Sequence, residues 1–362
     1  MNSEAAATKS RKIEHVNIVL TQDVQYKRIT SMFEDVKLIP TGKYIDPEKV
    51  DLKTSFLGKE IFAPIFVSGM TGGDERVGKI NYDIAAAVSE LCLPMGVGSQ
   101  RAMIEDGNVT KTYAVKSEYD VPILLGNIGA AQTLKYGIEQ ISEMVSSIEA
   151  DALCIHTNPA QEAAQKEGDI NFRGAFSSIC KIIDGIGVKT IVKEVGNGIS
   201  KEVARRFSKT NVYGLDTGGA GGTNWVAIEL YRAGNSALYK HIFKEWGIPT
   251  AQSLIEVRSE FSRMLTATGG IRTASDIAKA IALGADACGI AAPVVQAQSR
   301  GGAEGIKNYL ESMELSLREE MAALGVSNVK ELSSVKREIT GKLKVAIDQR
   351  INGVSFTKYL LS

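Results

Sequence analysis

The chain has 362 residues, of which 44% are hydrophobic and 23% are charged, the balance of a globular protein with a full core. Its 42 basic residues are matched by 42 acidic residues, so the formal net charge is +0. This balance argues against nucleic acid or an anionic membrane as the main partner, and any anion site must be local. The length suits one large α/β barrel with extensions, or two ordinary domains.

The N-terminal region lacks the apolar core of a signal sequence, and no uninterrupted run of about 18 apolar residues occurs, which predicts a cytoplasmic protein without a membrane partner. Residues 1–10 are small and polar, and we expect a disordered tail there. Residues 11–60 should form a basic arm, beginning at Arg11 and Lys12, and a lead-in that packs outside the main domain. A solvated surface cluster is the alternative interpretation of these two cations.

Apolar, β-like runs repeat eight times from Ile61 onward, and helical patterns separate most of them. Eight strands alternating with helices predict an α/β protein with a (β/α)₈ TIM barrel over residues 61–325, followed by a C-terminal helical extension over 326–362. A doubly wound open sheet is the alternative, which the count of eight disfavours. The runs are 61–67, 93–97, 122–126, 151–155, 189–193, 212–215, 263–267 and 287–291, and the helical patterns are 74–91, 109–118, 138–149, 172–183, 200–208, 251–261 and 274–283.

Two further features refine this prediction. Asp74 and Ser200 are suited to cap the helices that they precede. The segment 217–250, between the sixth and seventh strands, is too long for a plain loop. An insertion at this face of a barrel commonly builds a lid or a substrate wall.

Glycines and polar residues follow the strands repeatedly, and in a barrel all these strand ends meet at one rim. The last strand pair carries the turn Gly269, Gly270, Ile271 and Arg272. Glycine N–H groups and an arginine beside a helix N-terminus suit a phosphate. An ordinary turn with a surface arginine is the alternative. Thr223 is expected to contact the same phosphate.

The other strand ends suggest a planar, phosphorylated cofactor. Lys193 projects from the centre of the barrel, where its ammonium would stabilise negative charge on an electron-rich ring. The alternative is a core lysine that reaches outward to water. Asn127 and Ser99 would donate to ring carbonyls or nitrogens.

A second anion site is predicted from cations and donors that do not fit on such a ring: Arg11, Lys12, Arg101, His156, Asn158 and Gln161. Glu162 is an isolated carboxylate among them. One carboxylate together with substrate phosphates is a common way to hold Mg²⁺. Read alone, His156 would be a hydrogen-bonded core histidine and Glu162 a solvated helix residue.

These motifs also carry a family resemblance. RK-x-x-H, SGMTGG, GSQR, H-x-N-x-x-QE, VKEVG, GGxGGTNW and GGIR occur in this order between Arg11 and about Val295. The set resembles the type 2 isopentenyl-diphosphate isomerases. The resemblance implies a homo-oligomeric barrel, a tetramer or octamer, that binds FMN and Mg²⁺ and is reduced by NAD(P)H. It also implies interconversion of isopentenyl and dimethylallyl diphosphates.

The resemblance assigns site residues by their place in these motifs. The substrate would contact Gln100 as well as Ser99 and the residues of the second anion site. Candidate catalytic residues are Lys193, Gln161, Trp225 and Glu229, the last two bordering the reacting carbons. The FMN contacts would be Ser68, Gly69, Met70, Thr71, Ser99, Asn127, Lys193, Thr223, Gly269, Gly270, Ile271, Arg272, Ala291 and Ala292.

No pair of side chains is arranged to both add and remove a proton, because Glu162 is assigned to the metal and His156 to phosphate. We therefore expect reduced FMN to be the acid–base group, with Lys193 tuning its charge.

Rival functions make different demands. A 2-hydroxy-acid oxidase needs a histidine base and an arginine late in the barrel, and the only later histidine is His241, in the insertion. An enzyme similar to IMP dehydrogenase needs a cysteine after the sixth strand, where GGAGGTNW has none. A catalytically silent flavin-binding barrel would be yellow without Mg²⁺-dependent turnover.

Overall fold

The computed structural model describes residues 3–234 and 243–353, with side chains described from Arg11 onward; His241 therefore lies outside the described residues. Eight parallel strands close into a barrel in chain order, with the last strand paired to the first. The predicted (β/α)₈ barrel is confirmed. Its strands are β4 (Ile65–Val67), β5 (Met95–Gly96), β6 (Leu124–Gly129), β7 (Ala152–Thr157), β8 (Lys189–Glu194), β9 (Gly214–Asp216), β10 (Met264–Thr268) and β11 (Ala287–Ile290).

The parallel register brings the strand ends to one rim. His156 on β7 lies beside Lys193 on β8, and Lys193 lies beside Asp216 on β9. Because successive strand residues point to opposite faces, alternate side chains fill the lumen. Polar side chains that directly follow the strands therefore share one opening.

Helices cover the outside of the barrel and begin where polar caps predict. The Asp74 and Ser200 side chains each accept a backbone N–H of the helix that follows, so both predicted caps are confirmed. The helices are α2 (Glu75–Leu91), α3 (Arg101–Glu105), α4 (Ile138–Ser146), α5 (Pro159–Ala164), α6 (Ala175–Gly185), α7 (Lys201–Phe207), α8 (Trp225–Ala233), α9 (Thr250–Arg258), α10 (Ala274–Ala282) and α11 (Ala292–Leu324).

The helix predicted over 109–118 is wrong. This stretch forms two short 3₁₀ segments, η3 (Gly107–Thr112) and η4 (Val115–Ser117). Asp106 caps the first by accepting the Asn108 N–H, and short 3₁₀ turns are typical connectors. Two further 3₁₀ turns are η2 (Pro47–Lys49) and η5 (Gln132–Leu134).

The first barrel strand begins later than predicted. The run 61–67 is divided between β3 (Lys59–Ile61) and β4, with Pro64 between them. β3 instead forms a hairpin with β2 (Thr54–Phe56), turning through Leu57 and Gly58, which both have positive φ. Phe56 stacks on Phe66 with ring centroids 5.4 Å apart, so the hairpin packs against apolar side chains of the barrel strands.

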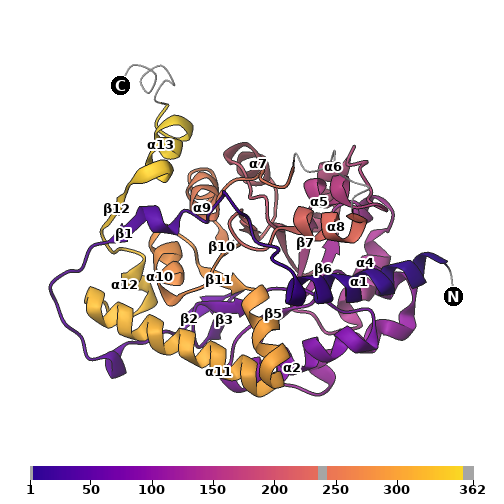
Figure 1. Cartoon of the computed structure of the whole chain (residues 1–362), viewed down its shortest axis with the longest axis horizontal. Helices are drawn as coiled ribbons and strands as arrows, with labels where there is room; N and C mark the ends of the chain where they lie inside the picture. The colour runs from indigo at the N-terminus through magenta and orange to yellow at the C-terminus, as the bar shows by residue number, and fades with distance from the viewer. Residues whose placement is uncertain (1–2, 235–242, 354–362) are drawn as a thin grey trace.

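Helix α1 (Ser3–Thr21) replaces the first part of the predicted arm. The structure is helical from Ser3, which differs from the expected disordered tail over residues 1–10. The run SEAAATK contains three alanines, and alanine has the highest helix propensity. α1 contacts α2, α3, α8 and α11, and lies at the right of Figure 1.

A strand from the N-terminal part of the chain pairs with a strand from the C-terminal part. β1 (Val36–Leu38), which follows η1 (Phe33–Asp35), pairs antiparallel with β12 (Arg337–Ile339). The long α11 bends at Gly301 and Gly302, which lack helical dihedral angles, as expected for a glycine pair. α12 (Val329–Leu332) and α13 (Gly341–Arg350) complete the C-terminal region.

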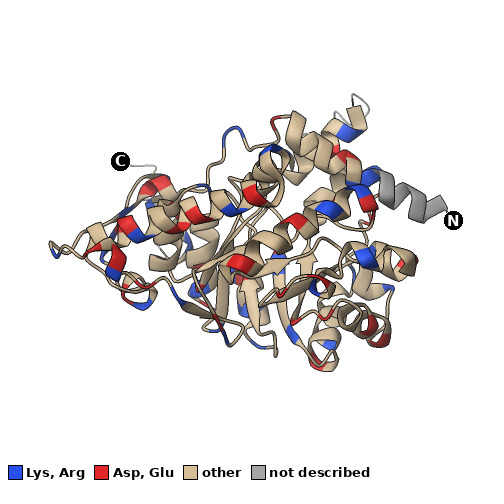
Figure 2. Cartoon of the chain, turned by 90° about the horizontal axis from the view of Figure 1, so that it is seen from below, with Lys and Arg blue, Asp and Glu red and all other residues tan. Residues whose placement is uncertain are grey.

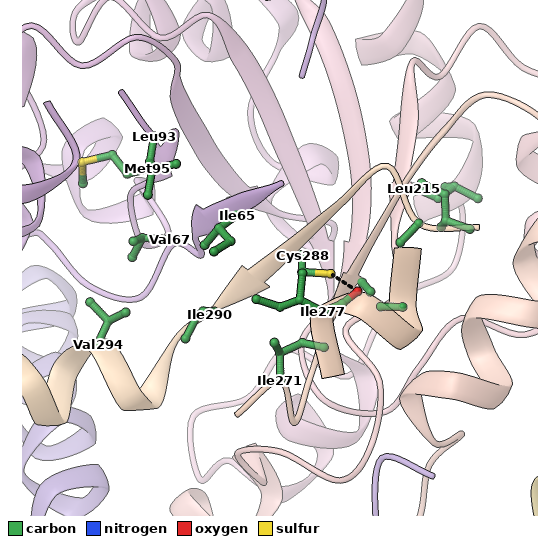
Figure 3. Close-up of a cluster of buried hydrophobic side chains, with 14 of the residues drawn as sticks. Ile65, Val67, Leu93, Met95, Leu215, Ile271, Ile277, Cys288, Ile290 and Val294 are labelled. Carbon is green, nitrogen blue, oxygen red and sulfur yellow. Dashed lines mark hydrogen bonds between the residues drawn. The ribbon is translucent and has the colours of Figure 1, made fainter. Parts of the chain in front are cut away.

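The core between the strands and the outer helices is apolar and close-packed. Ile65 on β4, Ile290 on β11, Ile277 of α10 and Val294 of α11 belong to one apolar cluster (Figure 3) and are all at most 1% exposed. The Cys288 thiol lies 4.0 Å from the Ile277 carbonyl. This packing fixes the strand ends and α10, which carry the candidate phosphate turn.

Charges of both signs are interspersed over the elements seen in Figure 2. Within residues 3–234 and 243–353, no helix is long and apolar enough to cross a membrane.

Candidate active site

One cavity opens at the carboxyl ends of the barrel strands, with residues of α1 and α8 in its wall. It encloses about 1560 Å³ of empty space, part of it open to solvent. Most predicted site residues line it: Arg11, Lys12, Ser68, Gly69, Met70, Thr71, Ser99, Arg101, Asn127, His156, Asn158, Gln161, Glu162, Lys193, Thr223, Trp225, Gly269, Gly270, Arg272, Ala291 and Ala292.

Three predicted residues lie behind this surface. Gln100 is fully buried, where its Oε1 accepts the Asn127 N–H at 2.9 Å. Ile271 is 1% exposed and packs in the core. Glu229 is 1% exposed and reaches the cavity only through the side chains that it binds.

The phosphate turn has the backbone that its glycines predict. Gly269 and Gly270 have φ of +99° and +75°, a region that other residues rarely adopt. A Cβ on Gly269 would lie 2.1 Å from the Gly219 carbonyl oxygen, so the two glycine loops are in close contact. Ala292, the first residue of α11, also lines the cavity, and a helix N-terminus favours an anion.

Arg272 extends from this turn into the cavity wall. Its Nη2 donates to Gln25 Oε1 at 2.9 Å, and its backbone N–H donates to Asp276 Oδ2 at 3.0 Å. Burial lowers the pKa of Arg272, an effect that nearby Tyr309 and Asp276 oppose. An arginine nevertheless stays charged, so this turn presents a partly desolvated cation.

In the central part of the cavity, glycines leave room that side chains would fill, and two buried hydroxyls have no hydrogen-bond partner. A Cβ on Gly69 would lie 2.1 Å from the Val97 carbonyl oxygen, and a Cβ on Gly289 would lie 2.4 Å from Ser68 Oγ. The hydroxyls of Ser68 and Thr71 are buried without a hydrogen-bond partner. Since buried polar groups are normally paired, these two hydroxyls suit a bound polar molecule.

Lys193, which is partly buried in the cavity wall, and the buried Asp216 form a pair of opposite charges. Lys193 Nζ donates to the Glu194 carbonyl at 2.6 Å and lies 3.9 Å from Asp216 Oδ2. Burial raises the pKa of Asp216, and the charge of Lys193 and the hydrogen bond from the Thr268 hydroxyl oppose this rise. The ammonium is thus held between a carbonyl and a carboxylate.

His156 is fixed in one tautomer by Asn127. Asn127 Nδ2 donates to the Val97 carbonyl at 3.1 Å, so its Oδ1 accepts from His156 Nδ1 at 2.7 Å. The second ring nitrogen of a neutral histidine is then an acceptor. Burial, followed by the charges of Lys193 and Lys12, lowers the pKa of His156 to about 3. In this state Nε2 of His156 is an acceptor, and the predicted contact of His156 with phosphate stays a prediction.

The basic arm enters the cavity on α1. Lys12 Nζ donates to the Ser99 carbonyl at 2.8 Å and to the Tyr113 hydroxyl. Burial and then the charge of Arg11 lower the pKa of Lys12 to about 7. When the amide oxygen of Gln165 faces Arg11, it accepts from Arg11 Nη1 at 2.9 Å, and the amide nitrogen donates to Glu229 Oε1 at 3.2 Å.

Glu229 on α8 binds both α1 and α5. Its Oε1 contacts His15 Nε2 at 2.8 Å and accepts from Gln161 Nε2 at 3.2 Å, while Oε2 accepts from Arg232 Nη1 at 2.6 Å. Burial would raise the pKa of Glu229, but the hydrogen bond from His15 and the charges of His15 and Arg232 lower it. Trp225 meets the His15 ring edge-on at 5.3 Å.

Glu162 lies on α5 with both oxygens in use. Oε1 accepts from Asn158 Nδ2 at 3.0 Å, and Oε2 accepts from the Asp169 N–H at 2.8 Å. In the part of the chain that the structure describes, no group of three His, Cys, Asp or Glu side chains is arranged to hold a metal. A Mg²⁺ ion at Glu162 would therefore depend on oxygens of a bound ligand.

Sequence reasoning missed five residues of this region. His15 stands in RK-x-x-H four residues after Arg11, and Gln165 follows Gln161 by four, so helical spacing could have indicated both. Glu194 stands in the motif VKEVG, and Asp216 directly follows the apolar run 212–215. Only Tyr113 had no signal, because its contact with Lys12 spans 101 residues.

Comparisons with known proteins agree with this geometry. Residues 156–338 match the family model of FMN-dependent dehydrogenases. A mandelate oxidase structure with a monooxide FMN adduct aligns over 93% of this chain and 100% of its own, with a TM-score of 0.64 and 16% identity. Another mandelate oxidase structure, with 3,3,3-trifluoro-2,2-dihydroxypropanoic acid, has a TM-score of 0.66, covering 92% of this chain and 98% of its own at 16% identity. Fold and cavity thus define an FMN-dependent type of (β/α)₈ barrel.

Sequence relatives narrow this class. The isopentenyl-diphosphate delta-isomerase of Pyrococcus furiosus is 38% identical over 98% of this chain and 93% of its own. That of Methanococcus aeolicus is 41% identical over 92% of this chain and 97% of its own. The chain belongs to the isopentenyl-diphosphate delta-isomerase family, as its motifs predicted.

Proposed function

We propose that this protein interconverts isopentenyl and dimethylallyl diphosphates, using reduced FMN as the acid–base cofactor and Mg²⁺ to hold the diphosphate. The single observation that carries the proposal is that one cavity is lined by two separate groups of anion-binding side chains. One is the Gly269–Arg272 turn, and the other comprises Arg11, Lys12 and Arg101. Two phosphorylated ligands in one cavity require such an arrangement.

The FMN assignment rests on the matched family and on the fit of this cavity. The phosphate would lie on the Gly269–Arg272 turn and the N-terminus of α11. The Ser68 and Thr71 hydroxyls would pair with polar atoms of the cofactor, and Lys193 would stabilise negative charge on its ring. When bound and reduced, FMN would supply the proton and an electron-rich surface beside the reacting carbons.

The chain's own residues would orient the substrate. Arg11, Lys12 and Arg101 would bind the diphosphate, with Glu162 completing the Mg²⁺ ligands that phosphate oxygens begin. Asn158 Oδ1 is buried without a partner and is suited to accept from a bound ligand. His156 would contact the same diphosphate once an anion raises its pKa.

Gln161, Trp225 and Glu229 would border the reacting carbons. The Gln161 side chain is held at both ends, because its Nε2 donates to Glu229 and its Oε1 accepts from Asn158 Nδ2 at 3.2 Å. Held side chains exclude water and keep one substrate orientation. NAD(P)H as the reductant, a cytoplasmic location and assembly into a tetramer or octamer remain part of the proposal.

The 2-hydroxy-acid oxidase alternative shares the fold with mandelate oxidase, but the site does not favour it. Over residues 11–234 and 243–353, the histidines are His15 and His156. Neither follows the late strands, where that chemistry needs a base.

The test is an isomerase assay on the FMN-loaded protein. We expect turnover of isopentenyl diphosphate only when the flavin is reduced and Mg²⁺ is present. A yellow protein that is inactive under these conditions would support the silent barrel, and oxidation of 2-hydroxy acids would support the oxidase.

A further inference from the structure

Tyr113 is a buried residue for which the proposed chemistry has no role so far. It follows η3 and has no exposed surface. Its ring lies against the glycine pair after β4: a Cβ on Gly72 would lie 2.2 Å from ring atom Cε1, and a Cβ on Gly73 would lie 2.8 Å from the hydroxyl. The glycines therefore create the space that the ring fills.

The hydroxyl of Tyr113 belongs to a closed set of three contacts. It donates to the Ser99 carbonyl at 2.9 Å. Lys12 Nζ donates to the same carbonyl at 2.8 Å and to the Tyr113 hydroxyl. The ammonium also lies 5.0 Å from the ring centroid, within the range of a cation–π interaction.

This geometry decides where the charge of Lys12 is directed. An ammonium has three N–H donors, and two of them are used by Ser99 and Tyr113. Since Lys12 lines the cavity, the third donor is available to a ligand there. Without the hydroxyl, the ammonium would have one fixed partner and more rotational freedom.

Packing alone does not require the hydroxyl. A phenylalanine has the same ring, and burying a phenol is unfavourable unless the hydroxyl is hydrogen-bonded. The oxygen is thus useful through its partners, one of which is the cation of the basic arm.

We propose that Tyr113 is a positioning residue, whose hydroxyl fixes the Lys12 ammonium so that one N–H points at the diphosphate of the substrate. This inference rests on the proposed function of the cavity. It links η3 to α1 and makes the second anion site dependent on a residue outside the cavity wall.

The experiment measures binding of isopentenyl diphosphate with Mg²⁺ to the oxidised, FMN-loaded protein by calorimetry. Tyr113→Phe is expected to weaken binding about tenfold, because a hydrogen bond to a charged group is lost. Tyr82→Phe is the matched control, because the Tyr82 hydroxyl donates to the Lys111 carbonyl, away from the cavity. This variant should bind isopentenyl diphosphate like the wild type. Equal FMN content in all variants checks the fold.

A double-mutant cycle separates positioning from a general structural effect. In a Lys12→Ala background, Tyr113→Phe should change the dissociation constant by less than about twofold, because the group that it positions is gone. A tenfold loss that persists without Lys12, or wild-type affinity in Tyr113→Phe alone, would overturn the inference. Absence of binding by the wild type would instead overturn the proposed function.

Discussion

At the scale of single residues, the site is shaped by burial and by neighbouring charges. His156 is neutral because burial and the cations Lys193 and Lys12 lower its pKa to about 3. Its proton is on Nδ1, which donates to Asn127. A diphosphate would reverse this balance, because a nearby negative charge favours the protonated ring.

Histidine NMR tests this state directly, since the chain has three histidines. In the ligand-free protein, the His156 resonance should show the neutral Nδ1–H tautomer from pH 8 to pH 5. The unfolded chain takes up this proton near its ordinary pKa of about 6.5, above the folded value. As the pH falls from about 6.5 toward about 3, His156 should therefore lower the free energy of unfolding. The substitution His156→Gln should reduce this loss of stability.

The spectrum of His156→Gln identifies the resonance, and added isopentenyl diphosphate should move the titration to higher pH. A midpoint near 6.5 without ligand would contradict the assigned environment.

Arg272 is the residue through which the proposed phosphate site can be tested. Arg272→Glu removes a charge-assisted contact and adds repulsion, so we expect FMN binding to weaken by about 2–4 kcal/mol. Equilibrium dialysis against FMN measures the change. Arg300→Glu, on the α11 surface, is a charge-matched control that should retain FMN; equal retention by both variants would place the phosphate elsewhere.

The proposed role of Glu162 as a Mg²⁺ ligand is tested by the Mg²⁺ requirement of turnover. Glu162→Gln keeps the size of the side chain and removes its charge, so the Mg²⁺ concentration for half-maximal turnover should rise about tenfold while FMN remains bound. Titration of turnover with MgCl₂ gives this value. An unchanged Mg²⁺ requirement would move the metal to another carboxylate, of which Glu229 is the next candidate.

At the scale of elements, the cavity is completed by contacts between α1 and α8. His15 contacts Glu229, and Glu14 on the same helix pairs with Arg232 at 2.9 Å. Arg232 also pairs with Glu229 at 2.6 Å and with Glu167 at 3.1 Å. Because most of these charges are partly or fully buried, they are screened less than surface pairs.

Glu229→Gln should loosen α1 without unfolding the barrel. It replaces a charged acceptor of His15 and Arg232, so docking of α1 should weaken by about 1.5–3 kcal/mol. We expect faster hydrogen exchange over residues 11–21, with exchange in the barrel strands unchanged. Glu260→Gln is the control, since Glu260 pairs with Arg205 on the barrel exterior; similar exchange in both variants would contradict the role of Glu229.

At the scale of the whole molecule, the sequence predicted the barrel because its signals are local. Apolar runs, glycine turns and caps such as Asp74 are readable within about ten residues, and parallel strands then bring their ends together. Contacts between distant segments were not readable. The contacts of Gln100 with Asn127 and of Tyr113 with Lys12 depend on packing that only the closed barrel creates.

The most direct test of the account uses the reduced, FMN-loaded protein with Mg²⁺ and isopentenyl diphosphate in D₂O. We expect dimethylallyl diphosphate with deuterium from the solvent, many product molecules per flavin, and no product from the oxidised protein. Proton NMR of the product gives both the yield and the labelled position. No product from the reduced protein, product without deuterium, or one product molecule per flavin would contradict a flavin-dependent isomerase that exchanges protons with solvent.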